Sequence, residues 1–250
     1  MILRVPHRPA SFSTCLLLSL LLVFPVLLPA CTRPGAARSH RATPVPPPTE
    51  PALAPPRPAA YAALGASETF GVGARPRSKG YAYLIARAFH ASHFVNTGIP
   101  GTTLNAGYQT ELTRALSIRP SLTTVFFGVN DLRDGVKRGA FLRDLHDLVA
   151  TLRQAHSQVL IIGVPDLSLV PAASRIPHLH ANVTAWNVGM RRVAKQTGAG
   201  FLDLRSFARQ LARHPKYIAP DGLHPSNAGH ARLAQVILSE VRRTGLWSVH

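Results

Sequence analysis

Short apolar runs alternate with longer amphipathic segments from about residue 59 to the end of the chain. The apolar runs are short enough for buried strands, whereas the longer segments repeat apolar residues at the three- and four-residue spacing of a helix. Strands are therefore predicted at the start of residues 59–74, 93–101 and 122–131, and at residues 158–165 and 200–204. Helices are predicted at residues 80–89, 103–116, 139–155, 181–198 and 227–244.

The regular alternation of strands and helices indicates the fold class. Parallel strands need crossover connections, and helices in those connections cover both faces of the sheet. We expect an α/β protein, built as a three-layer α/β/α sandwich around a central, mainly parallel, five-stranded sheet. In such folds the loops at the carboxyl ends of the strands hold the functional residues.

The first 30 residues have the pattern of an export signal. Arg4 and Arg8 give a basic start, and residues 15–28 form an apolar stretch typical of a signal core. That stretch is short of the ~20 residues that cross a membrane. Residues 28–31, Leu-Pro-Ala-Cys, resemble the end of a bacterial lipoprotein signal, which implies lipid attachment at Cys31 and a protein held outside the cytoplasm. An ordinary cleaved signal and an uncleaved anchor are the alternatives.

Residues 31–58 are rich in Pro, Ala and Arg and poor in large apolar residues. This composition predicts an extended linker between the signal at residues 1–30 and one folded domain at residues 59–250. Of the two cysteines, Cys15 lies in the apolar stretch and Cys31 is the lipidation candidate. The folded domain therefore has no cysteine for a disulfide, a thiol nucleophile or a metal site.

The chain is strongly basic, with a formal net charge of +17. Residues 59–250 hold 22 of the 28 basic residues and 10 of the 11 acidic ones, without a block of Lys and Arg or interleaved aromatic residues. We interpret this charge as a surface that favours anionic polymers or lipid head groups. Specific nucleic-acid binding is not expected, because no recognised binding motif accompanies the charge.

Polar or glycine-rich loops follow the first three predicted strands. Ser67 follows the first strand, residues 96–101 follow the second, and Asn130 follows the third. Parallel strands bring such loops to one edge of the sheet. A serine hydroxyl becomes a useful nucleophile when a base takes its proton, and the N–H groups of Gly101 and Asn130 could stabilise developing negative charge.

The base could come from residues 217–230, near the end of the chain. Asp221 precedes His224 by three positions, and Gly222 and Pro225 restrict the backbone around this pair. A carboxylate beside an imidazole can hold the ring in one tautomer and stabilise its charged form, which suits the ring to proton transfer. The other histidines, including the pair at residues 178 and 180, are interpreted as surface or loop residues and not as metal ligands.

Four short blocks of the sequence resemble, in order and approximate spacing, those of the SGNH hydrolases, also called GDSL esterases and lipases. The blocks are residues 65–67, 96–101, 128–131 and 221–225. The resemblance spans about residues 60–245 and implies an SGNH/flavodoxin-like fold and hydrolysis of esters of small molecules or polymers. Ala66 departs from the pattern, since the family usually has an aspartate before its nucleophile.

The resemblance also implies a role for each candidate residue. Ser67 would be the nucleophile, and its backbone N–H would be one donor of the oxyanion hole. Gly101 and Asn130 would supply the other two donors. His224 would act as general base and then as acid, with Asp221 orienting its ring. Such a mechanism needs no metal or cofactor, and we expect a monomer attached to a membrane through its lipid.

Other functions fit the sequence less well. A dinucleotide-binding fold would need G-x-G-x-x-G after the first strand, and an α/β-hydrolase would need G-x-S-x-G around Ser67. Residues 65–76 match neither pattern. An inactive envelope-binding protein on the same fold is a further alternative, although all five candidate site residues are present. An acyltransferase would use the same residues as the hydrolase.

Overall fold

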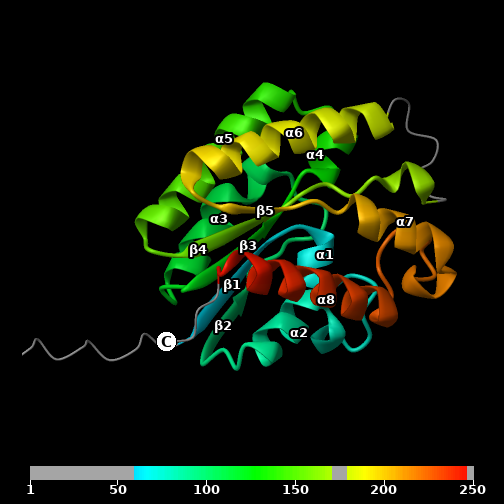
Figure 1. Ribbon diagram of the computed structural model, residues 1–250, viewed down its shortest axis with the longest axis horizontal. Helices are drawn as coiled ribbons and strands as arrows, with labels where there is room; N and C mark the ends of the chain where they lie inside the picture. Colours follow the sequence, from blue (N-terminus) through cyan, green and yellow to red (C-terminus); the bar gives the residue numbers. More distant parts are fainter. Residues whose placement is uncertain (1–58, 171–178, 247–250) are drawn as a thin grey trace, which may run out of the picture. The chain divides into compact units, whose positions relative to one another are not determined.

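The computed structural model describes residues 59–170 and 179–246 (Figure 1). Five parallel strands form one sheet in the order β2-β1-β3-β4-β5. The strands are β1 (Ala60–Gly65), β2 (His93–Asn96), β3 (Leu122–Phe126), β4 (Gln158–Ile162) and β5 (Gly200–Leu202). The prediction of a central, mainly parallel, five-stranded sheet is confirmed.

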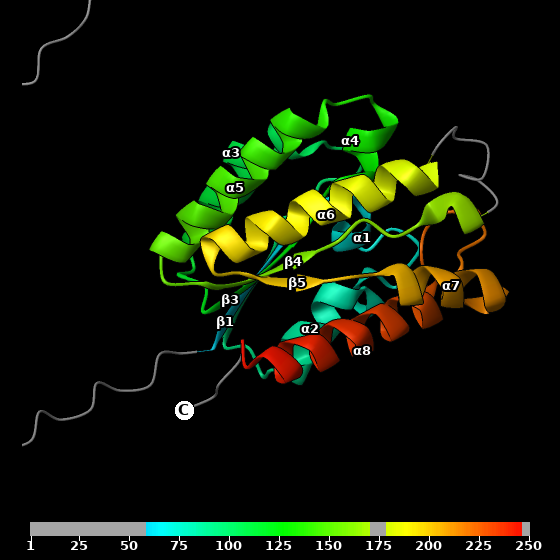
Figure 2. The ribbon, with the colours of Figure 1, turned by 45° about the horizontal axis from the view of Figure 1, so that its top comes forward.

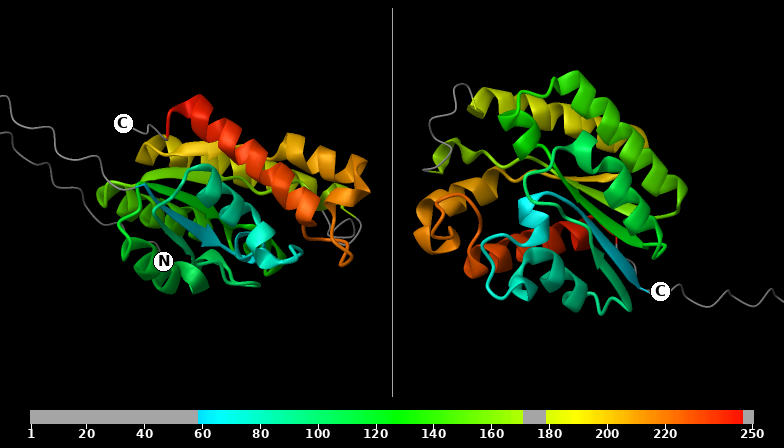
Figure 3. Two further views of the ribbon diagram at one scale, coloured as in Figure 1. Left: turned by 90° about the horizontal axis from the view of Figure 1, so that it is seen from below. Right: turned by 180° about the vertical axis from the view of Figure 1, so that it is seen from behind.

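Eight α-helices connect and cover these strands in the described part of the chain. They are α1 (Ser67–Phe70), α2 (Tyr81–Ala88), α3 (Leu104–Leu116), α4 (Val129–Arg133), α5 (Arg138–Gln154), α6 (Leu179–Thr197), α7 (Arg205–Arg213) and α8 (Asn227–Thr244). Apolar side chains of α3, α5 and α6 pack on one face of the sheet, and those of α2, α7 and α8 pack on the other. Figures 2 and 3 show the resulting three layers, with α8 lying beside α2.

The strand β1, between β2 and β3, is buried on both faces, so its side chains divide between the two helical layers. Ala62 and Leu64 belong to the core under α3, α5 and α6, whereas Tyr61 and Ala63 belong to the core under α2, α7 and α8. This division follows from the two-residue period of a strand. It also explains why the strand reads as a continuous apolar run and not as an alternating one.

The register of the strands brings three strand ends to the same edge of the sheet. Gly65 of β1 lies beside Phe126 of β3, and Ala63 of β1 lies beside Asn96 of β2. The chain therefore leaves β1, β2 and β3 at neighbouring points. The candidate residues were predicted from the sequence at these same strand ends.

Three α-helices of the structure were not predicted from the sequence. α1 and α4 are single turns at the ends of β1 and β3, too short to show a helical period. α7 is longer, but its nine residues include three arginines and bury only Phe207, Ala208 and Leu211. Tertiary packing of this narrow apolar stripe, and not an extended periodic pattern, explains the helix.

The predictions for the signal at residues 1–30, Cys31 and the linker at residues 31–58 lie outside the described residues. Within the described ranges, no helix combines the length and the apolar character that crossing a membrane requires.

Candidate active site

Ser67 is the first residue of α1, directly after the turn that ends β1. The turn depends on Gly65, whose φ of +151° is unfavourable for other residues. A Cβ atom at Gly65 would also collide with Thr69 Oγ1 and Phe126 O. The serine that follows keeps only 9% of its surface exposed. β1 and the tight turn therefore place this hydroxyl at the edge where three strands end.

The Ser67 hydroxyl donates a hydrogen bond to its neighbour Glu68, with 3.1 Å between Ser67 Oγ and Glu68 Oε2. Glu68 is itself buried. Transfer of the serine proton to His224 would require the hydroxyl to turn away from Glu68. Hydrogen bonds of catalytic groups often form only when substrate is bound, so this orientation is compatible with a nucleophile at rest.

The side chains of Asp221 and His224, the expected acid and base, are in direct contact. His224 Nδ1 lies 2.7 Å from Asp221 Oδ2, and the backbone N–H groups of Leu223 and His224 donate to Asp221 Oδ1 at 2.9 and 3.0 Å. Burial alone would raise the pKa of Asp221, but these hydrogen bonds outweigh burial and hold the pKa below its usual range. The ionised carboxylate fits a ring with its hydrogen on Nδ1, which leaves Nε2 to exchange a proton.

The segment after Ser67 is fastened to the segment that carries His224. Asn227, three residues after His224, accepts from Arg75 N and donates to Arg75 O, both at 2.8 Å. Gly73 lies so close to Pro225 O that a Cβ atom there would collide with it. These contacts join two parts of the chain that are about 150 residues apart, so the fold brings the serine and histidine segments together.

His230, at the start of α8, adds a second connection between the same segments. Its Nε2 lies 2.9 Å from Val72 O, and its Nδ1 accepts from Tyr81 N at 3.3 Å. Burial is the main influence on the pKa of His230 and lowers it, so the ring is neutral with its hydrogen on Nε2. The sequence reading did not identify His230 or Asn227. Their only signal was their position just after the His224 loop.

The two other expected oxyanion donors follow the ends of neighbouring strands, Gly101 in the loop after β2 and Asn130 in α4 after β3. Gly101 has a φ of +80°, and a Cβ atom there would have open space around it. Asn130 is buried and donates from Nδ2 to Thr102 O at 2.9 Å. An amide nitrogen carries two hydrogens, so this contact fixes the side chain and leaves one N–H for a ligand.

Asp131, the residue after Asn130, caps a helix. Its Oδ1 accepts from Leu104 N at 3.0 Å, at the start of α3. Burial raises the pKa of Asp131 to about 6. The carboxyl group therefore ties the loop after β3 to the loop after β2, which carries Gly101.

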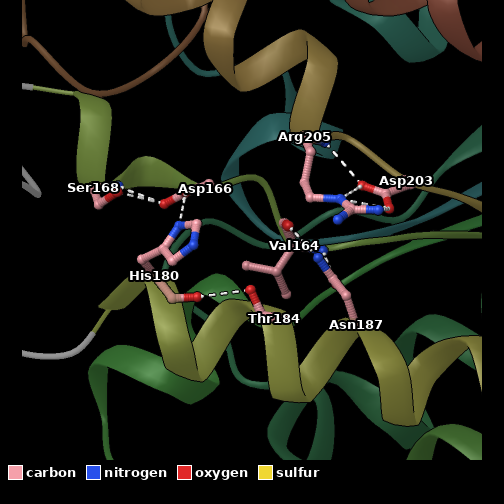
Figure 4. Close-up of polar contacts among 8 residues, drawn as sticks. All are labelled: Val164, Asp166, Ser168, His180, Thr184, Asn187, Asp203 and Arg205. Carbon is pink, nitrogen blue, oxygen red and sulfur yellow. Dashed lines mark hydrogen bonds and ion pairs between the residues drawn. The ribbon is translucent and has the colours of Figure 1, made fainter.

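A polar cluster lies at the carboxyl end of β4 (Figure 4). Asp166 accepts from Ser168 Oγ at 2.6 Å, and its other oxygen lies 2.5 Å from His180 Nδ1 of α6. Nearby, Asn187 of α6 bonds both the N–H and the carbonyl of Val164. The His180 side chain is 71% exposed, and the described residues contain no group of three potential metal ligands. The cluster fastens the β4 loop to α6.

Comparison with known proteins supports a family for this chain. The sequence model of the GDSL-like lipase/acylhydrolase family matches residues 63–232. The matched range runs from β1 to α8 and includes all five candidate residues of the site. No sequence among the curated proteins matches the chain.

Several solved structures share the fold. TesA is 20% identical, with a TM-score of 0.62, and the match covers 75% of this chain and 99% of TesA. Axe2, an acetylxylan esterase from Geobacillus stearothermophilus, solved as a catalytic mutant, is 18% identical with a TM-score of 0.61, covering 73% of this chain and 94% of Axe2. CEX, a two-domain esterase active on acetylated mannans, is 23% identical with a TM-score of 0.59, covering 76% of this chain and 50% of CEX.

Proposed function

Because the chain belongs to the GDSL-like lipase/acylhydrolase family and is an ester-hydrolysing enzyme, we propose that it cleaves carboxylic esters through an acyl-enzyme formed on Ser67. One observation carries the proposal. The segment after Ser67 is bonded to Asn227 and His230 at the start of α8, which directly follows the loop in which Asp221 bonds His224. A nucleophile and an oriented base on adjoining segments are the parts that acyl transfer needs.

In the first half of the reaction, the Ser67 hydroxyl turns from Glu68 to His224. Nε2 of His224 takes the proton as Ser67 Oγ attacks the ester carbonyl, and Asp221 stabilises the imidazolium that forms. The resulting tetrahedral intermediate carries a negative oxygen. The imidazolium then gives its proton to the departing alcohol oxygen as the carbon–oxygen bond breaks, which leaves the acyl group on Ser67.

In the second half, water replaces the alcohol. His224 takes a proton from the water as its oxygen attacks the acyl-enzyme, and it returns that proton to Ser67 Oγ when the acid leaves. In both halves the negative oxygen is stabilised by the backbone N–H groups of Ser67 and Gly101 and by the remaining N–H of Asn130. The reaction consumes only the ester and water, and no step requires an electron donor.

Asn130→Ala should lower kcat for an aryl acetate about 10²–10³-fold, because it removes a donor to an oxyanion that exists only during the reaction. KM should change much less, since the ester carbonyl in the ground state needs that donor less. Steady-state kinetics would measure both. Asn105→Ala is a suitable control, because Asn105 is exposed and bonds only a half-buried aspartate on α5. A rise in KM of about 10²–10³-fold with unchanged kcat would assign Asn130 to substrate binding instead.

We propose an acetylated carbohydrate or a lipid as the ester substrate. Axe2 acts on acetylxylan and CEX on acetylated mannans, which supports the carbohydrate class, whereas the basic surface fits either class if the polymer or membrane is anionic. A panel of aryl esters of increasing acyl length, followed by acetyl-xylan and a lysophospholipid, tests this proposal. Preference for acetyl would select the carbohydrate, preference for longer chains would select the lipid, and no turnover of any ester would overturn the proposed activity.

We also propose that the enzyme is a monomer that works outside the cytoplasm, held at a membrane by lipid on Cys31. The support is the signal-like sequence of residues 1–31. Cys31→Ser should move the protein from the membrane pellet to the soluble fraction of expressing bacteria and abolish labelling by a radioactive fatty acid. The same fractionation of a Cys15→Ser variant is the control. Equal labelling of the Cys31→Ser variant and the wild type would exclude Cys31 as the lipidation site.

A further inference from the structure

Glu111 is a buried acid directly beside the turn that leads to Ser67. It lies on α3, and none of its surface is exposed. Its Oε2 accepts from Gly65 N at 2.8 Å and lies 3.0 Å from Thr97 Oγ1. Its other oxygen, Oε1, has no hydrogen-bond partner in the structure. No salt bridge pairs Glu111 with a cation among the described residues.

We propose that Glu111 is a positioning residue, whose neutral carboxyl group fastens the nucleophile turn at Gly65 to the oxyanion loop that begins at Thr97. The proposal rests on the proposed function, because it assigns Ser67 and Gly101 the roles given above. It adds a carboxyl group that touches neither the substrate nor the reacting atoms.

The connection matters because of where its two ends lie. Gly65 is two residues before Ser67, so the direction of its peptide group sets where α1 begins. Thr97 follows β2 and opens the loop that carries Gly101. One carboxyl oxygen therefore holds the supports of the nucleophile and of one oxyanion donor together. Because attack requires the reacting atoms to be aligned, a shift of about 1 Å between these supports can cost about 10²-fold in rate.

The hydrogen bonds favour the neutral form of Glu111. Thr97 Oγ1 lies within donor distance of both Glu111 Oε2 and Ala63 O, at 3.0 and 3.1 Å, but a hydroxyl has only one proton to give. If Oε2 carries a proton and donates it to Thr97 Oγ1, then Thr97 can donate to Ala63 O, and both contacts are made. Gly65 N still donates to Oε2. An ionised Glu111 would satisfy only one of the two Thr97 contacts.

The electrostatic surroundings favour the same form. Burial raises the pKa of Glu111, and because the hydrogen bonds with Gly65 and Thr97 and the charge of Arg114 offset only part of this rise, the pKa is about 8. Arg114, on the next turn of α3, is exposed. The other buried titratable side chains on neighbouring elements are acids: Tyr81 of α2, whose pKa Glu111 helps to raise, Tyr61 of β1, Glu68 of α1 and Asp131 of α4. His93 of β2 is exposed, and the ionisable residues of α5 are at least partly exposed.

Glu111→Gln tests the positioning role because it keeps the size and the neutrality of the side chain. A single amide atom cannot both accept from Gly65 and donate to Thr97. We expect kcat for an aryl acetate to fall about 10- to 100-fold and KM to stay within about twofold. Glu240→Gln, which alters an acid paired with Arg243 on α8, is the matched control and should retain the wild-type kcat. Wild-type kcat in the Glu111→Gln variant would overturn the role.

A second measurement does not depend on activity. From about pH 5 to about pH 8, unfolded chains have released the Glu111 proton whereas folded chains keep it, so the stability of the wild type falls as pH rises. The glutamine variant has no such proton. The folding equilibrium constant of the wild type, divided by that of the variant, should therefore fall by up to about tenfold per pH unit as pH rises. The fall should level off above about pH 8.

Urea unfolding of both proteins at a series of pH values measures that ratio. If the free energy of unfolding changed with pH equally in both proteins, Glu111 would not be held neutral. That result would overturn the proposal even if the variant had a low kcat. If Ser67→Ala kept full activity, the proposed function would fail, but this pH comparison would still decide whether Glu111 is neutral.

Discussion

Ser67→Ala should lower kcat/KM for an aryl acetate by about 10⁴–10⁶-fold, because no acyl-enzyme can form without the hydroxyl. The residual rate would come from the oxyanion donors and from substrate binding. The side chain makes one hydrogen bond, to Glu68, so the free energy of unfolding should change by only about 1 kcal/mol. Steady-state kinetics and urea unfolding of the same preparation separate the two effects.

A second serine provides the control for this prediction. Ser206→Ala makes the same chemical change at an exposed position in the first turn of α7. It should leave both kcat/KM and stability at wild-type values. A fluorophosphonate probe should label the wild type and the Ser206→Ala protein but not the Ser67→Ala protein. If the Ser67→Ala variant retained wild-type turnover, the acyl-enzyme mechanism would have to be abandoned.

The fold was predictable because the sheet is parallel and buried on both faces. Such strands appear as short apolar runs, and a longer amphipathic helix with a recognisable pattern lies between each strand and the next. The prediction for the last helix, residues 227–244, coincides with α8. The prediction for residues 181–198 starts two residues late relative to α6, because the helix begins at Leu179.

The location of the candidate residues followed from the same topology. Once the first three strands were predicted to be parallel, the loops after them had to lie at one edge of the sheet, and the register of β1, β2 and β3 agrees with that arrangement. The resemblance to a known family then supplied the roles. The pairing of Asp221 with His224 needed only a three-residue spacing, and the structure contains it.

The residues that fasten the segments to each other could not be predicted in this way. His230 and Asn227 bond Val72 and Arg75, which are about 150 residues away, and no local pattern distinguishes these contacts from those of an ordinary helix start. Glu111 has a polar side chain in an amphipathic helix and would be expected to face solvent. Its burial depends on the approach of Gly65 and Thr97, which only the folded chain brings about.

His224→Ala should reduce kcat/KM for an aryl acetate by about 10⁴–10⁶-fold, about as much as the loss of Ser67, because the nucleophile and its base act as one unit. The loop should keep its shape, since Asp221 Oδ1 still accepts from the backbone N–H groups of residues 223 and 224. The same assay measures the loss. His214→Ala, at an exposed histidine just after α7, is the control and should keep wild-type activity.

Chemical rescue distinguishes a base from a structural residue. Removing the His224 ring leaves space beside the Asp221 carboxylate, which bonded that ring at 2.7 Å. Added imidazole can bind there in the same orientation and take the Ser67 proton, so it should restore part of the lost activity in proportion to its concentration. His230→Ala is the contrasting variant, because its buried ring holds Val72 and Tyr81 and has no part in proton transfer. That variant should lose stability, and imidazole should not restore its activity. If imidazole failed to rescue His224→Ala while the variant remained folded and still bound ester, His224 would not be the base.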